Sequence, residues 1–245
     1  MVSQKAWRPE AAARLFVTVI LTLFCGMFLA LLVETLFKTT WTEGARDLVE
    51  MILMTICFHV AILLWTWRFL RNEEISWREA FFARRRDWQC ALLGLAAGAL
   101  ATKPLAWLEG FLTEAAEKLF GWHLAAQELV EKMGSPETTL AAKAFVGVTA
   151  IVVAPLAEEM LFRGTLYPTA KQVGFPRAAL WGTSILFGLS HLNAMAFVPL
   201  TLFAAMLAGL YELTDNLMAP VMAHCALNAI NFYWIMTVPA GPGAH

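Results

Sequence analysis

The residues best suited to chemistry lie in the second half of the chain, inside otherwise apolar segments. They are Glu158, Glu159, Arg163, His191, His224 and Asn228. Ionisable groups are costly to place inside a membrane, so each one found in such a segment is a candidate functional residue. The first two apolar segments carry fewer, and we interpret Glu50, His59 and His123 as structural. We therefore expect one shared site in the last part of the chain.

The first piece of this site contains two adjacent carboxylates and an arginine. On a helix, Glu159 and Arg163 are four positions apart, share a face and can pair. Glu158 is rotated about 100° from its neighbour and should therefore meet another partner or water. Pro155 lacks the N–H that would bond to the Ile151 carbonyl, so we expect the helix to be disturbed just before the acids.

The second piece is a histidine that reaches the same depth as the first carboxylate. Counted from a turn at Phe175, Glu158 lies 17 residues back and His191 lies 16 residues forward. A carboxylate beside an imidazole can hold and deprotonate a water, which is the general-base arrangement for hydrolysis. Asn193 is expected either to orient His191 or to cap a helix. Serine chemistry at Ser190 is not expected, because the GxSxG pattern is absent.

The third piece is a histidine and an asparagine on one helical face. His224 and Asn228 are four residues apart, so the imidazole and the amide project together from a helix. Two donors aimed at one point suit the negative charge that develops on a carbonyl oxygen during acyl transfer. A single histidine in a membrane span is more often an interhelical hydrogen-bond partner. The concentration of these residues in the last spans favours a shared site instead.

Taken in order, the motifs EExxxR, FxxxH and HxxxN resemble those of the CPBP family. This family comprises the type II CAAX prenyl endopeptidases and bacterial proteins linked to bacteriocin self-protection and protein processing. The motifs occupy Glu158–Arg163, Phe187–His191 and His224–Asn228, and the resemblance covers roughly residues 140–237. The first 139 residues show no family signature.

The resemblance implies a role for each matched residue. Glu158 would be the general base and His191 its partner in holding the attacking water, so no covalent intermediate is expected. The oxyanion hole would be lined by His224 and Asn228, and the supporting pair would be Glu159 and Arg163. The family's fold is an all-helical membrane bundle whose catalytic cavity opens towards the cytosol.

The elements that must position these residues are predicted from the composition. Hydrophobic residues make up 59% of the 245 residues and charged ones 15%, against about 25% charged in soluble domains. In lipid only helices and closed barrels satisfy the backbone, and the apolar segments have helical lengths. We predict an all-α, polytopic transmembrane helical bundle with its catalytic cavity in the last four of about seven spans. These spans are 15–36, 48–67, 88–108, 142–168, 177–192, 195–213 and 217–237.

The basic residues predict how the bundle is oriented. The stretch 68–87 carries six arginines and the N-terminus three basic residues, which places both in the cytoplasm by the positive-inside rule. The first span is too long for a signal-peptide core and is expected to be an anchor. We expect an interfacial helix within 68–87, a break at Lys103-Pro104 and an amphipathic helix outside the hydrocarbon core over 107–139.

The predicted organisation is therefore an N-terminal part, 1–139, a catalytic helical core, 140–237, and a short tail, 238–245. The predicted function is an intramembrane glutamate-type endopeptidase of a bacterial cytoplasmic membrane. Its expected partners are the lipid bilayer and a membrane-embedded or lipid-anchored protein or peptide substrate, and no nucleic acid is implied by the net charge of −1. No cofactor is expected.

Three alternatives stay open at this stage. Glu158, His191 and His224 could together bind zinc in a metal-dependent version of the same protease, although an HExxH motif is absent. The chain could be a non-catalytic membrane adaptor or immunity protein. It could also be a proton-coupled transporter, although the inverted repeats typical of transporters are not evident.

Overall fold

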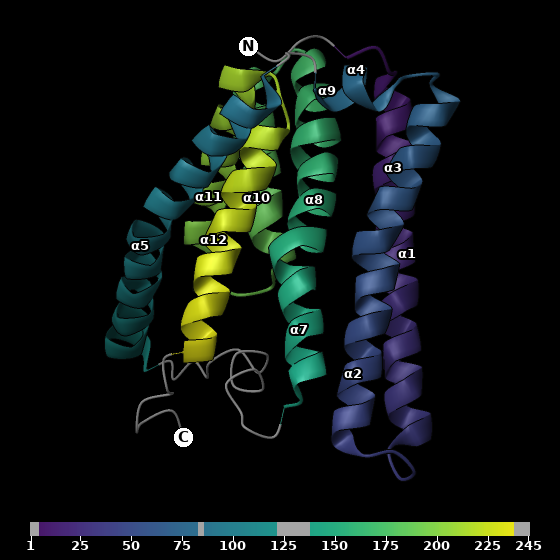
Figure 1. The fold of residues 1–245 in the computed structure, drawn as a ribbon, viewed down its shortest axis with the longest axis vertical. Coiled ribbons are helices and arrows are strands. Elements are labelled where there is room, and N and C mark those ends of the chain that lie inside the picture. Colours follow the sequence, from purple (N-terminus) through teal and green to yellow (C-terminus); the bar gives the residue numbers. More distant parts are fainter. Residues whose placement is uncertain (1–4, 83–85, 122–137, 238–245) are drawn as a thin grey trace.

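The computed structural model describes residues 5–82, 86–121 and 138–237, and over these ranges the regular secondary structure is helical. This confirms the predicted all-α bundle (Figure 1). The N-terminal part begins with α1 (Pro9–Phe37), which pairs with an antiparallel helical run. That run is α2 (Glu43–Met54), the π-helical turn η1 (Thr55–Val60) and α3 (Ala61–Asn72).

Two further helices belong to the described residues of the N-terminal part. The short α4 (Trp77–Phe81) begins at a capping box, in which the Ser76 side chain accepts from the Glu79 backbone and Glu79 accepts from Ser76. The long α5 (Asp87–Phe120) follows. Of the expected interfacial helix in 68–87, the described residues contain α4 and the end of α3.

The second half is built around one long helical column. It consists of α7 (Leu140–Val148), η2 (Thr149–Val153), α8 (Ala154–Glu159), η3 (Met160–Leu166) and α9 (Tyr167–Gln172), where η2 and η3 are π-helical. The irregularity expected near Pro155 thus takes the form of a π-helical turn immediately before it. The column is followed by α10 (Pro176–Ser190), α11 (Phe197–Thr214) and α12 (Met218–Thr237).

Within the described ranges, five helical runs are long and apolar enough to cross a membrane. They are Pro9–Phe37, Gly44–Asn72, Asp87–Phe120, Leu140–Gln172 and Phe197–Thr214. The other two expected spans correspond to α10 and α12. Helix α10 has 15 residues, so it extends about 22 Å and is shorter than a hydrocarbon core of about 30 Å. The turn that follows α10 therefore lies part-way down the bundle (Figure 1), and this turn carries His191.

The expected break at Lys103-Pro104 is wrong, because α5 runs without interruption from Asp87 to Phe120. Membrane helices tolerate an internal proline where neighbouring groups accommodate the freed backbone carbonyl. Lys103 is exposed on this helix, so its long side chain can carry the ammonium group away from the apolar surface. Of the amphipathic helix expected over 107–139, residues 107–120 simply continue α5, and 122–137 lie outside the described residues.

Close approach of α5 to α12 depends on two glycines. A Cβ on Gly94 would collide with the Ala219 carbonyl oxygen, and a Cβ on Gly98 would collide with that of Ala223. Small residues four positions apart let membrane helices approach at backbone distance. Since His224 directly follows Ala223, this contact also sets the position of a candidate site residue.

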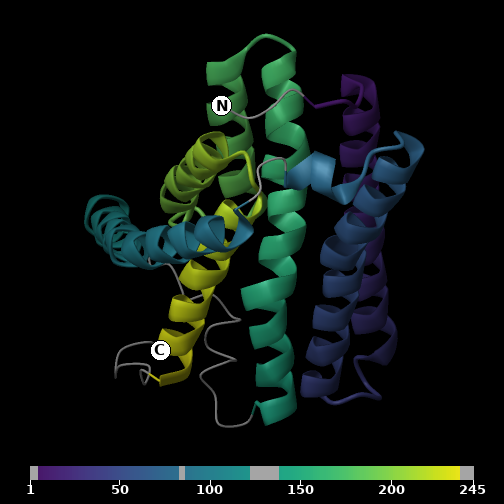
Figure 2. The same ribbon diagram turned by 45° about the horizontal axis from the view of Figure 1, so that its top comes forward.

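The end of the bundle that carries α4 is covered by side chains and backbone. In Figure 2, α4 lies between α3 and the long central column. The Phe81 carbonyl accepts a 2.8 Å hydrogen bond from the Leu217 backbone. Large buried side chains fill this end, among them Trp7, Phe81, Tyr167, Tyr211 and Leu217.

Candidate active site

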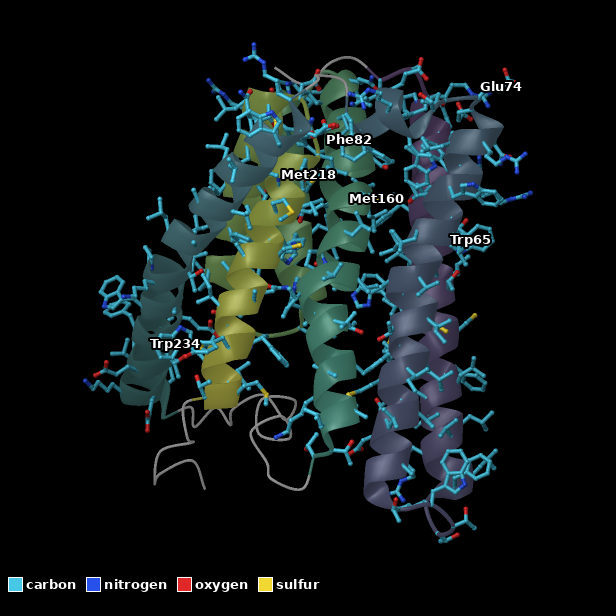
Figure 3. All side chains as sticks on the ribbon, viewed as in Figure 1. Trp65, Glu74, Phe82, Met160, Met218 and Trp234 are labelled. Carbon is cyan, nitrogen blue, oxygen red and sulfur yellow. The ribbon has the colours of Figure 1, made fainter. Side chains whose placement is uncertain are left out.

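The two acidic residues lie at the end of α8, in the middle of the long column. Glu158 is 8% exposed and Glu159 is fully buried. Oε1 of Glu159 accepts a 2.8 Å hydrogen bond from Nη1 of Arg163, which is the pairing expected from their spacing. Arg163 also donates to the Ala204 carbonyl at 3.2 Å, so it ties the column to α11. Met160, labelled in Figure 3, follows the two acids directly and is buried.

His224 of α12 lies between the two carboxylates. Its Nδ1 is 2.9 Å from Oε1 of Glu159, and its Nε2 is 4.0 Å from Oε2 of Glu158. With Arg163 the cluster contains two buried acids and one permanent cation. Buried charges are tolerated when they are paired. A carboxylate oxygen accepts, so Nδ1 of His224 donates to Glu159 and this contact fixes the orientation of the ring.

His191 lies directly after α10, where the chain turns towards α11. Its Nδ1 is 2.8 Å from the Phe187 carbonyl oxygen. Because a carbonyl only accepts, Nδ1 carries the hydrogen and the neutral ring presents Nε2 as an acceptor. His191 interacts electrostatically with Glu158 and is otherwise exposed. Asn193 accepts from the backbone N–H groups of Met195 and Ala196. It therefore stabilises the turn that precedes α11, whose N-cap residue is Ala196.

Phe187 is the packing centre of the site and explains the phenylalanine of the FxxxH motif. Its ring is fully buried, with centroids 4.8 Å from the His191 ring and 5.8 Å from the His224 ring. The Arg163 guanidinium lies 4.5 Å from the same centroid, within the range of a cation–π contact. One aromatic ring therefore holds both histidines and the arginine in place.

Asn228 lies one helical turn beyond His224 on α12. Its Nδ2 donates a 2.7 Å hydrogen bond to the Ala150 carbonyl. This bond fixes the amide plane and leaves its second N–H and its Oδ1 for other partners. The structure thus gathers His191, His224 and Arg163 around Phe187, brings His224 near Glu158, and holds Asn228 by a contact with the backbone of the column.

The site also contains His59, which the sequence analysis assigned to structure. Nε2 of His59 lies 3.5 Å from Oε1 of Glu158, and both side chains are largely buried. The interpretation of His59 as purely structural did not anticipate this contact. The rule that an ionisable group in a membrane span is a functional candidate was the signal that could have identified it.

Each of the three π-helical turns contributes one contact to this cluster. His59 belongs to η1, Arg163 belongs to η3, and η2 provides the Ala150 carbonyl that Asn228 binds. A π-helical turn inserts one extra residue into a helix and is frequent at functional sites.

The described residues contain no group of three or more His, Cys, Asp and Glu side chains arranged to hold a metal ion. On His191 and His224, Nδ1 is already engaged by a protein oxygen, which leaves only Nε2 on each ring for another ligand. The zinc alternative is addressed below by a chelation experiment.

Comparison with known proteins relates the second half of the chain to a peptidase family. Residues 140–230 match the family described as type II CAAX prenyl endopeptidase Rce1-like. The chain is also 33% identical over 78 residues to the uncharacterized protein YpbD of Bacillus subtilis (strain 168), which covers 30% of this chain and 37% of that protein. The chain thus spans well under half the length of this curated relative. No solved structure matches the chain. The matched segment contains all three motifs, which confirms the resemblance seen in the sequence.

Proposed function

Because residues 140–230 match a family of prenyl endopeptidases, we propose that the chain is an intramembrane endopeptidase with water as its nucleophile. The observation that carries this proposal is the arrangement around Glu158. One of its oxygens, Oε1, faces His59, whereas Oε2 is buried and has no hydrogen-bond partner among the residues that the structure describes. A general base needs an oxygen that the protein does not already occupy.

In the proposed first step, one hydrogen of the attacking water faces Oε2 of Glu158 and the other faces Nε2 of His191. The water oxygen attacks the scissile carbonyl carbon while its proton passes to Glu158. The resulting tetrahedral intermediate collapses when the protonated Glu158 returns this proton to the departing amine. The products are a carboxylic acid and an amine, so atoms and charge balance without a covalent enzyme intermediate.

The charge that develops on the carbonyl oxygen needs donors that are fixed in advance. We assign this role to Nε2–H of His224 and to the second amide N–H of Asn228. Glu159 supports it, because its contact with Nδ1 orients the His224 ring. Asn228 is oriented in the same way by its bond to Ala150.

The proposed substrate is a membrane-embedded or lipid-anchored protein or peptide, cut near its C-terminus. In a CAAX sequence the cysteine carries a prenyl group and three residues follow it. The burial of the candidate site in a bundle with five membrane-span helices favours a substrate that is itself held in the bilayer. We place the chain in a bacterial cytoplasmic membrane with its N-terminus in the cytoplasm.

The experiment that tests this function compares the termini of membrane proteins in cells that lack the native gene and carry one variant each. Wild type should generate protein termini that are missing with His191→Ala and with Glu158→Gln. Ser190→Ala is the matched control, since Ser190 adjoins His191 but bonds only to the Phe187 carbonyl, and it should retain the wild-type termini. Identical termini with all four proteins would overturn the proteolytic function and favour the adaptor alternative.

A further inference from the structure

The segment that matches the peptidase family does not contain every group in contact with the proposed base. We propose that His59, from the N-terminal part of the chain, is a positioning residue that holds Glu158 with one oxygen engaged and the other directed to the water. This inference rests on the proposed function and adds to it a residue outside the matched residues 140–230.

The geometry of the contact is specific. Nε2 of His59 is 3.5 Å from Oε1 of Glu158, with side-chain exposures of 18% and 11%. The His59 ring also packs edge-on against Phe58, with centroids 5.1 Å apart. The π-helical turn η1 contacts both α8 and η2. His59 therefore reaches the carboxylate from the side opposite to α12.

The two oxygens of Glu158 consequently have different surroundings. Oε1 faces the His59 imidazole, whereas Oε2 lacks a protein hydrogen-bond partner. A carboxylate rotates about its last side-chain bond with broad preferences, so an unheld Glu158 would present either oxygen at a range of angles. A donor fixed at Oε1 restricts this rotation and keeps Oε2 in the position that proton abstraction requires.

The second nitrogen of His59 argues against a purely structural role. Nδ1 is buried and has no hydrogen-bond partner among the described protein atoms. A histidine that serves as interhelical glue is expected to satisfy its buried polar atoms, because an unsatisfied one costs about 1–3 kcal/mol. Among the described residues, the polar contact of the His59 ring is made by Nε2, and it is made to the proposed base. A buried polar atom without a hydrogen-bond partner in a native structure often has a functional explanation.

The test uses three variants in the full-length chain. His59→Phe keeps a ring but removes the donor, and His59→Gln keeps an N–H donor at similar reach. Ile56→Ala is the control, because Ile56 belongs to the same π-helical turn but is exposed. Cells carrying each variant are first compared for the wild-type-dependent protein termini described above. The purified proteins are then assayed on a synthetic peptide that spans the most abundant of these cleavage sites.

We expect His59→Phe to lower kcat by about 10- to 100-fold, as a misplaced catalytic group does, with KM within about twofold of wild type. His59→Gln should restore most of the lost kcat, and Ile56→Ala should match wild type. A purely structural role would instead lower the amount of folded protein and leave kcat of the folded fraction unchanged. Wild-type kcat in His59→Phe, or no recovery in His59→Gln, would overturn this inference alone. Absence of any wild-type-dependent cleavage would overturn the proposed function itself.

Discussion

Nδ1 of His224 and Oε1 of Glu159 lie 2.9 Å apart, and the same oxygen accepts from Arg163 at 2.8 Å. One carboxylate oxygen therefore joins α12 to the central column, and Arg163 extends the connection to α11 through the Ala204 carbonyl. The column that carries the proposed base and its support is thus joined to α12, which carries the oxyanion donors, and to α11. The cluster is both a structural junction and the frame of the proposed site.

Removal of the cation from this junction should destabilise the protein strongly. Arg163→Met leaves the fully buried Glu159 without its permanent counter-charge, and breaking a buried pair from one side costs about 3–5 kcal/mol. The purified protein in mild detergent is titrated with a denaturing detergent, and its unfolding is monitored by circular dichroism. Arg14→Met, at an exposed position of α1, should change the free energy of unfolding by less than about 0.5 kcal/mol. Equal effects of the two substitutions would contradict the buried junction.

The glycine contact between α5 and α12 should tolerate no added methyl group. Gly98→Ala forces the two backbones apart at Ala223, so we expect a loss of about 1–3 kcal/mol, as in other overpacked contacts. Gly110 lies on the same helix with nothing near its Cβ position. Gly110→Ala should therefore be neutral or stabilising by about 0.5–1 kcal/mol. Thermal unfolding of both variants checks this prediction, and a stable Gly98→Ala protein would show that the helices do not approach at this point.

Stability at alkaline pH should depend on Lys5, which lies outside the spanning helices and donates to the Ala80 carbonyl. Burial lowers the pKa of the Lys5 ammonium below its ordinary value of 10.5, and the Asp215 carboxylate opposes this shift. At pH values between the pKa of Lys5 in the folded protein and its higher pKa in the unfolded chain, the unfolded chain binds more protons than the folded protein. The free energy of unfolding should therefore rise as pH rises through that window.

Lys5→Met removes the titrating group, so the free energy of unfolding of the variant should lack the pH-dependent contribution of Lys5. The measurement is the difference in unfolding free energy between wild type and Lys5→Met, taken from neutral pH up to about 10.5. We expect wild type to gain stability relative to the variant as pH increases. A difference that stays constant over this range would contradict the buried position of the ammonium.

Metal removal separates the proposed mechanism from its zinc version. Incubation of the purified wild type with a strong chelator such as 1,10-phenanthroline, followed by desalting, should leave peptide cleavage unchanged. The reason is that the proposed nucleophile is a water activated by Glu158 and His191. Loss of cleavage that returns on addition of zinc would instead establish a metal-dependent hydrolase.

The sequence predicted the class of fold because the physics of lipid leaves few choices. Long uncharged segments had to be helices, and residues four apart, such as Glu159 and Arg163, had to share a face. The bounds of α10 were predicted to within two residues, but the position of its C-terminal end part-way down the bundle (Figure 1) was not predicted. The uncharged run over Ala178–Tyr211 has the same composition whether it crosses the bilayer twice or turns back part-way. The packing of this segment against the rest of the bundle decides which of the two arrangements forms, and a local sequence pattern does not reveal that packing.

His59 was not predicted for a similar reason. It lies about 100 residues before Glu158, and only the packing of η1 against α8 brings the two together. The three π-helical turns also leave no simple trace in the hydrophobic periodicity, although each one determines where a site residue points. The break expected at Pro104 failed because a proline rule derived from soluble helices is weaker in membrane helices.

The central claim is that the Glu158 carboxylate abstracts the proton of the attacking water. Its most direct test is the turnover number of purified Glu158→Gln on the peptide that spans the most abundant wild-type cleavage site, with the folded fraction measured in the same sample. Glutamine keeps the shape of the side chain but removes the base, so kcat should fall about 10²- to 10⁴-fold. Undiminished turnover by folded Glu158→Gln would contradict the account.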